Sequence, residues 1–266
     1  MIRDITLGQY YPANSVLHRL DPRVKLVATL VYVISLFLFQ SFTGYIVATV
    51  FLLSIIALSH VPVRFIFKGL KAVFILLIIT AILNVFLTPG RELVSFWKIT
   101  ITIEGVKLAA FMMIRLVYLI IGSSIMTLTT TPSSLTDGLE KGLGWMKFMK
   151  VPVHEIAMMM SIALSFIPIL MEETDKIIKA QQARGADFES GNLIKRARAL
   201  VPILVPLFVS AFRRANDLAL AMESRCYRGG EGRTKLHPLK YKKRDVIAYL
   251  ILLAYLAAII TVGIIF

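Results

Sequence analysis

Residues 42–59 read FTGYIVATVFLLSIIALS, eighteen residues without one acidic or basic side chain. A helix needs about 17–25 mostly apolar residues to cross the hydrocarbon core of a bilayer, so this stretch is long enough to span it. Three similar windows follow the same rule, with Lys25 at the edge of the first: Val24 to Gln40, Ala72 to Thr88 and Val246 to Phe266. The chain is therefore predicted to be an all-α integral membrane protein.

A fifth apolar window, Gly105 to Thr130, contains Lys107 near one end and Arg115 well inside. A charged side chain within a span faces the helix bundle and finds a polar partner there. We expect Arg115 to tie helices together through backbone carbonyl groups or Asn84, in preference to contacting a transported substrate. This window completes a set of about five transmembrane helices.

The composition agrees with a membrane protein and indicates its orientation. Of the 266 residues, 57% are hydrophobic and only 17% are charged, against about 25% charged residues in soluble domains. With a cytoplasmic N-terminus, the five spans place 26 of the 30 Lys and Arg residues on the cytoplasmic side. This distribution follows the positive-inside tendency. It predicts a multi-pass protein of the cell membrane with its N-terminus in the cytoplasm.

Two further apolar stretches, Ile156 to Met171 and Ala199 to Phe212, fail this charge test as spans. If both crossed the membrane, six basic residues between them would lie outside. The second stretch is short and contains Pro202 and Pro206. We therefore predict that these stretches are the apolar faces of helices at the cytoplasmic surface.

The segment 132–245 is too long for an unstructured loop, so it is expected to fold. Its pattern predicts a short helix from Ser134 to Met149, weakened at its two glycines, and two long crossed helices. The first long helix runs from Val153 to Arg184, and the second from Asn192 to about Tyr227. The predicted organisation is a membrane domain (1–131), a cytoplasmic coupling module (132–245) and a C-terminal transmembrane helix (246–266).

The ends of the two long helices resemble each other. The first ends in Ala183-Arg184-Gly185 and the second in Ser224-Arg225-Cys226, so the two arginines lie 41 positions apart. A cation at a helix C-terminus is favoured by the helix dipole, and each arginine could be a simple cap. Two such ends on two long helices favour paired docking points instead, because the guanidinium binds carboxylates and carbonyl groups of a partner.

At these residues the chain resembles the transmembrane coupling subunit of energy-coupling-factor transporters. The resemblance covers nearly the whole chain and is carried by the following segments: LDPRVK (20–25), LTTTP (128–132), FIPILMEETDKI (166–177), ARGADF (183–188), PLFVSAFRRANDLALAME (206–223) and YRGGEGRT (227–234). The paired arginine motifs make it specific.

The resemblance implies a non-catalytic subunit of an ATP-driven importer of vitamins or other micronutrients. Such an importer has two cytoplasmic ABC-type ATPases, which use ATP and Mg, and a membrane subunit that captures the substrate. It also implies that Ala183, Arg184 and Gly185 dock on one ATPase. The second motif, Ser224, Arg225 and Cys226, departs from the family pattern at both flanks. Since cysteine replaces the glycine that stops a helix, we expect the second helix to continue to Gly229.

Four residues on the first long helix are candidates for contact with the capture subunit: Met158, Met159, Ile162 and Ala163. Methionine side chains adapt to several partners, which suits a subunit that serves more than one capture protein. The alternative is that this face packs only against the chain's own spans.

Other functions find less support in the sequence. No Gly-x-x-x-x-Gly-Lys-Ser/Thr motif occurs, so ATP chemistry and its cofactors are expected on partner subunits. The four histidines show no metal-binding spacing, and bases mixed with acids without aromatic platforms argue against nucleic acid. The bilayer lipids are the expected counter-charge.

A self-contained secondary carrier remains the alternative, although no internal repeat and no acid deep in a span supports it. An intramembrane enzyme would need a nucleophile and base or a metal cluster in the spans, and we identify neither.

Overall fold

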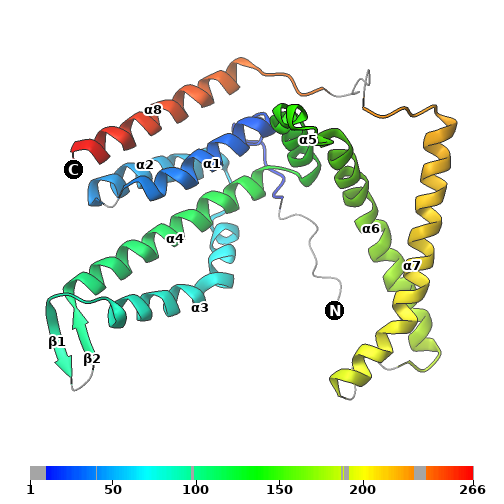
Figure 1. The fold of residues 1–266 in the computed structure, drawn as a ribbon, viewed down its shortest axis with the longest axis horizontal. Helices are drawn as coiled ribbons and strands as arrows, with labels where there is room; N and C mark the ends of the chain where they lie inside the picture. The colour runs from blue at the N-terminus through cyan, green and yellow to red at the C-terminus, as the bar shows by residue number, and fades with distance from the viewer. Residues whose placement is uncertain are drawn as a thin grey trace. The chain divides into compact units, whose positions relative to one another are not determined.

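The computed structural model describes residues 10–39, 41–96, 99–186, 188, 192–230 and 238–265. These residues form helices in almost every segment (Figure 1). The elements in chain order are α1 (Pro22–Leu38), α2 (Phe42–Ser59), α3 (Val63–Leu87), β1 (Glu92–Phe96), β2 (Ile99–Thr102), α4 (Ile103–Thr129), α5 (Pro132–Gly142), the 3-10 helix η1 (Leu143–Met149), α6 (Val153–Ala183), α7 (Leu193–Ser224) and α8 (Lys243–Ile265).

The chain divides into two compact units. One is drawn from residues 8–138 and 239–266, and the other from residues 139–238. The first therefore contains α1 to α4, most of α5 and the C-terminal helix α8, and the second contains η1, α6 and α7.

The first unit is a helix bundle around an apolar core. Helix α4 packs along α3 and also contacts α1 and α2, while α8 packs against α1 and α2. Tyr32, Leu36, Ala48 and Ile259 are buried at the centre, and the rings of Phe51 and Tyr255 stack with their centroids 4.0 Å apart. Large apolar side chains are also exposed on the outer faces of these helices, as expected where lipid replaces water.

The predicted all-α membrane fold is confirmed. Helix α2 has the bounds expected from its sequence, and α1, α3, α4 and α8 cover the other four predicted spans. By length and composition, the five helices that could cross a membrane are α2, α4, α6, α7 and α8, and α3 qualifies if its two halves are taken as one span. Helix α1 has 17 residues, which is the lower end of the range of about 17–25 residues that can cross a bilayer. The surface position of α6 and α7 stays a prediction that rests on charge, since both are apolar enough to qualify.

A small hairpin interrupts the helices between α3 and α4, in a segment for which the sequence analysis predicted no strand. β1 and β2 pair antiparallel, with Phe96 opposite Ile99 and Val94 opposite Ile101. The segment is rich in β-branched residues, which favour extended backbone. Thr102 ends the hairpin and caps α4, because its hydroxyl oxygen accepts a hydrogen bond from the Gly105 amide at 3.1 Å.

The sequence offered two kinds of partner for Arg115, backbone carbonyl groups or Asn84, and the structure shows the first. Its guanidinium donates to the carbonyl oxygen of Phe39, the residue that follows α1, at 3.3 Å, and lies 5.3 Å from the ring centre of Phe37. The tie to a backbone carbonyl is therefore confirmed. Within the described residues no hydrogen bond joins Arg115 to Asn84, whose side-chain NH2 group donates to the Thr80 carbonyl of its own helix at 2.8 Å.

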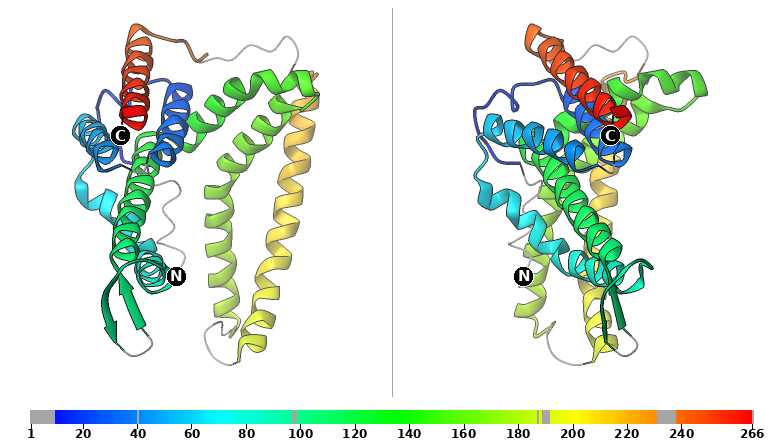
Figure 2. Two further views of the ribbon diagram at one scale, coloured as in Figure 1. Left: turned by 60° about the vertical axis from the view of Figure 1, so that its left-hand side comes forward. Right: turned by 90° about the vertical axis from the view of Figure 1, so that its left-hand side faces the viewer.

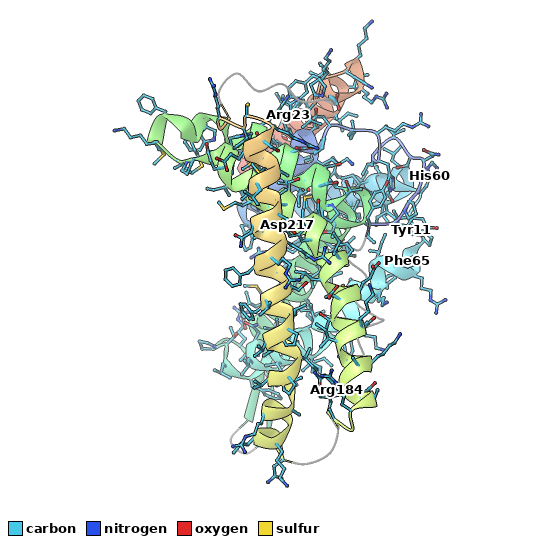
Figure 3. The ribbon with its side chains drawn as sticks, turned by 90° about the vertical axis from the view of Figure 1, so that its right-hand side faces the viewer. Tyr11, Arg23, His60, Phe65, Arg184 and Asp217 are labelled. Carbon is cyan, nitrogen blue, oxygen red and sulfur yellow. The ribbon has the colours of Figure 1, made fainter. Side chains whose placement is uncertain are left out.

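One backbone amide and one side-chain ammonium close the C-terminal end of α4. The Tyr11 amide donates to the carbonyl of Leu128 at 2.9 Å, and the Lys25 ammonium donates to the carbonyl of Thr129 at 2.8 Å. These carbonyls have no partner within the helix, so the N-terminal segment and α1 supply their hydrogen bonds. The rings of Tyr11 and Phe65 lie side by side at 5.2 Å and hold the same segment against α3 (Figure 3).

The short helix predicted from Ser134 to Met149 is split in two. It is α-helical as α5 up to Gly142 and then tightens to the 3-10 turn η1, as expected from the low helix propensity of Gly142 and Gly144. A hydrogen bond of 2.8 Å between His154 Nδ1 and the Glu140 carboxylate joins the end of α5 to the start of α6. The backbone of Gly230 lies directly against the same ring, and a Cβ atom there would clash with it.

Helices α6 and α7 run antiparallel and side by side, as both views in Figure 2 show. They contain 31 and 32 residues, or about 46 to 48 Å of helix each at 1.5 Å per residue. Glu173 of α6 and Arg214 of α7 form an ion pair between them at 3.5 Å. The two long helices predicted for this segment are thus present.

Candidate docking site

The end of α6 is a helix stop built entirely from backbone hydrogen bonds. The Gly185 amide donates to the carbonyl of Gln182 at 2.9 Å, and the Ala186 amide donates to that of Gln181 at 3.0 Å. Gly185 has a φ of +85°, the left-handed conformation that this pattern requires. Together these features define a Schellman motif with Arg184 as the last half-helical residue.

The end of α7 repeats this geometry. The Cys226 amide donates to the carbonyl of Glu223 at 2.8 Å, and the Tyr227 amide donates to that of Met222 at 3.1 Å. Cys226 takes the left-handed conformation, with a φ of +54°, and Arg225 occupies the position of Arg184. Each arginine is therefore the C-cap of its helix.

The expectation that α7 would continue to Gly229 is wrong. The helix ends at Ser224, because Cys226 adopts the positive φ usually left to glycine. A left-handed residue with a Cβ costs roughly 1–2 kcal/mol. The two Schellman hydrogen bonds satisfy carbonyls that would otherwise have no partner, which offsets this cost.

The caps do not need arginine side chains. All the hydrogen bonds that end the two helices come from backbone amides, so another residue could occupy either C-cap position. Arg184 and Arg225 are both exposed, and neither forms an ion pair within the part of the chain that the structure describes. Interaction with the helix dipole contributes only about 0.3–1 kcal/mol. The side chains are thus available to another molecule.

The two motifs lie at opposite ends of the α6–α7 pair. Arg184 ends α6 beside the connection to α7 (Figure 3). Arg225 follows the last residue of α7, at the other end of a helix about 48 Å long. The flanking positions Ala183, Gly185, Ser224 and Cys226 are also exposed. The structure therefore presents two separate exposed sites rather than one combined site.

The four methionine-face residues lie along the first half of α6. Met159 is 59% exposed and Ala163 is also exposed, whereas Met158 and Ile162 are half-buried. This face is thus only partly covered within the second unit.

A second apolar stripe lies on α7, within the stretch Ala199 to Phe212 that the sequence predicted to be the apolar face of a helix. Its six residues recur at helical spacing and are each 47–66% exposed, namely Val201, Leu204, Val205, Phe208, Val209 and Phe212. The positions i, i+3, i+4, i+7, i+8 and i+11 fall on one side of a helix, and that spacing alone would have identified them. An exposed patch of this kind marks a surface for protein or lipid.

No group of three or more His, Cys, Asp or Glu side chains that could hold a metal ion is found among the described residues.

Comparison with known proteins identifies the family. Residues 13–236 match the family model described as "Cobalt transport protein". The energy-coupling factor transporter transmembrane protein EcfT of Clostridium kluyveri is 59% identical over 252 residues, covering 94% of this chain and 93% of the relative. The protein of the same name from Thermosediminibacter oceani is 52% identical over 94% of each chain. That of Ruminiclostridium cellulolyticum is 50% identical over the full length of both. The chain belongs to the EcfT family of energy-coupling factor transporter transmembrane proteins, the membrane subunits of a class of bacterial transporters.

Proposed function

We propose that this chain couples ATP hydrolysis on two cytoplasmic ABC-type ATPases to substrate import by a separate membrane capture subunit. One observation carries the proposal: α6 and α7 end in the same Schellman geometry, and each presents an exposed arginine at its C-cap. Two equivalent ends suit two equivalent partners, as in a pair of ATPases.

The docking chemistry follows from the arginine side chain. A guanidinium presents five N–H donors in a planar fork and stays charged at any physiological pH. It can bind a carboxylate and backbone carbonyls in a groove of each ATPase at once. Arg184 and Arg225 are the contact residues. The residues on either side of them have small side chains, which let the partner surface approach closely: Ala183, Gly185, Ser224 and Cys226.

The antiparallel helices then transmit movement. When the ATPases bind ATP and Mg and close, the two docked ends are displaced relative to each other. Each helix is continuous over about 46–48 Å, so a displacement at its end shifts its apolar half as well. The contact between the helices includes the long 3.5 Å ion pair of Glu173 and Arg214, whose side chains are 30% and 38% exposed. Such a pair contributes little stability and permits sliding.

The apolar halves of the same helices are the surface for the capture subunit. The α6 face contributes Met158, Met159, Ile162 and Ala163, and the α7 stripe contributes bulky exposed residues such as Phe208. Flexible methionines and a broad apolar stripe can repack against different partners. The substrate, a vitamin or similar micronutrient, is selected by the capture subunit, and the N-terminus of this chain lies in the cytoplasm.

The test is purification of the tagged full-length chain together with co-expressed ATPases and a capture subunit. Arg184→Glu or Arg225→Glu is expected to leave membrane insertion intact, to lower recovery of the ATPases and to abolish uptake, because a carboxylate then occupies a site that holds a cation. Lys176→Glu is the matched control, since it makes the same charge change at an exposed site on α6. Full uptake by the Arg184→Glu/Arg225→Glu double variant would refute docking. Transport by the chain alone in vesicles would refute the coupling role.

A further inference from the structure

The 3-10 helix η1 presents large apolar side chains to the outside of the second unit. Phe148 is 96% exposed, Trp145 is 68% exposed and Met149 is 63% exposed. Side chains of this size rarely stand free in water when they are adjacent in the chain. The feature is separate from the α6 face, the α7 stripe and the arginine motifs.

The charged side chains of the turn itself are all basic, between the flanking acids Glu140 and Glu155. Residues 141–154 contain Lys141, Lys147 and Lys150 and no Asp or Glu. The nearest preceding acid, Glu140, is hydrogen-bonded to His154 at 2.8 Å. The segment therefore combines an exposed aromatic and methionine cluster with a net charge of about +3 at neutral pH.

This combination matches the chemistry of an anionic membrane surface. Tryptophan is enriched at the membrane–water interface, because its ring is apolar and its N–H can reach polar groups. Lysines next to inserted aromatic rings are attracted to the phosphates of anionic lipids. A protein groove for the same cluster would have to be apolar and acidic together.

The chain connectivity keeps the cluster near the bilayer. η1 begins fourteen residues after the last residue of α4, a membrane-spanning helix, and eleven of the intervening residues form α5. Helix α5 is only about 16 Å long at 1.5 Å per residue. The lipid headgroup region is thus within reach of η1.

We propose that η1 is an interfacial anchor, in which Trp145, Phe148 and Met149 insert into an anionic lipid surface while the exposed residues Lys141 and Lys150 bind headgroup phosphates. Such an anchor would hold the start of α6 at the membrane while its far end is displaced. The proposal needs neither an ATPase nor a capture subunit, so it can fail or succeed independently of the docking proposal.

The test uses Trp145 as a fluorescent probe. The chain has two tryptophans, so Trp97→Phe leaves Trp145 as the single one. The full chain is reconstituted into vesicles with anionic lipid brominated near the headgroup end of its acyl chains. We expect blue-shifted emission, quenching by the brominated lipid and protection from the aqueous quencher acrylamide.

The lysines are tested in the same vesicles. Replacing Lys141 and Lys150 with glutamine is expected to lower the lipid quenching about twofold or more in anionic vesicles. The control replaces Lys176 and Lys179 with glutamine, and is expected to leave the quenching unchanged. Circular dichroism checks that each variant keeps its helices.

Two results would overturn the anchor. Emission typical of water, with strong acrylamide quenching, would mean that Trp145 stays in solvent. Protection from both acrylamide and brominated lipid would mean that protein covers the cluster.

Discussion

The backbone amide of Asp21 donates a hydrogen bond of 2.9 Å to the carboxylate of Asp245, although 224 positions separate them in the chain. Asp21 is the N-cap of α1, and Asp245 lies in the first turn of α8. The second Asp245 oxygen accepts from the Lys242 amide at 2.7 Å, so one buried carboxylate closes the start of α8 and holds it to the start of α1.

Removing this carboxylate should loosen the first unit. Asp245→Ala leaves the buried Asp21 amide without its acceptor, and we expect a loss of about 1–3 kcal/mol in the free energy of unfolding. Asp245→Asn keeps one acceptor oxygen and should lose less. Thermal unfolding of the full chain in detergent measures both, and Asp217→Ala, at an exposed position on α7, serves as the control. Equal unfolding temperatures for Asp245→Ala and the wild type would contradict this role.

The two helix stops predict opposite effects of glycine exchange. Cys226→Gly relieves the left-handed strain and should stabilise the end of α7 by about 1 kcal/mol. Gly185→Ala adds a Cβ at φ +85° and should destabilise the end of α6 by a similar amount, even though no atom lies near enough to clash. Hydrogen exchange of the Tyr227 and Ala186 amides reports the two ends. A faster exchange of the Tyr227 amide in Cys226→Gly would argue against strain at this position.

The charge and the shape of the docking arginines can be separated. Lysine keeps the charge but lacks the planar fork, so Arg184→Lys and Arg225→Lys should retain ATPase binding with about tenfold lower affinity. Arg184→Gln and Arg225→Gln should bind more weakly still. Binding of each purified ATPase to the reconstituted chain gives the comparison. If lysine and arginine bound equally, a simple charge contact would be sufficient.

His18 predicts a pH dependence in the N-terminal segment. Its Nε2 bonds to the Tyr11 carbonyl at 2.9 Å and its Nδ1 to Ser15 Oγ at 2.7 Å. Burial lowers the pKa of His18 below its usual 6.5, and Lys25 and His60 lower it further. The folded segment thus binds the proton less well than the unfolded one. The stabilisation is complete above pH 6.5 and is lost as pH falls through the lowered pKa.

Hydrogen exchange of the Tyr11 amide between pH 7.5 and 5, corrected for its intrinsic pH dependence, measures this loss. His18→Gln should flatten the profile, because glutamine offers similar donors without titrating. An unchanged pH profile in His18→Gln would assign the effect to another group.

Much of this fold follows from local sequence. Charge-free windows of spanning length predicted the membrane helices, and the bounds of α2 agree to the residue, because the bilayer sets a minimum apolar length. Gly185 also marked the end of α6, because glycine readily takes the left-handed conformation that stops a helix. The β1–β2 hairpin was not predicted, because a short β-branched segment between two spans has no pattern that separates it from a loop.

The sequence alone determined the membrane class of this protein, the positions of its main apolar helices and those of its two arginine ends, since these depend on hydropathy, charge and nearby residues. The stop of α7 at Ser224 was not predicted, although it is local: Cys226 takes the left-handed conformation and completes a Schellman motif. The tertiary structure decided two other things. It tied Arg115 to the Phe39 carbonyl, and it joined Asp21 to Asp245. Each depends on a choice of hydrogen-bond partner that the local sequence pattern does not reveal. Which backbone carbonyls and amides need a partner is known only once the backbone has folded.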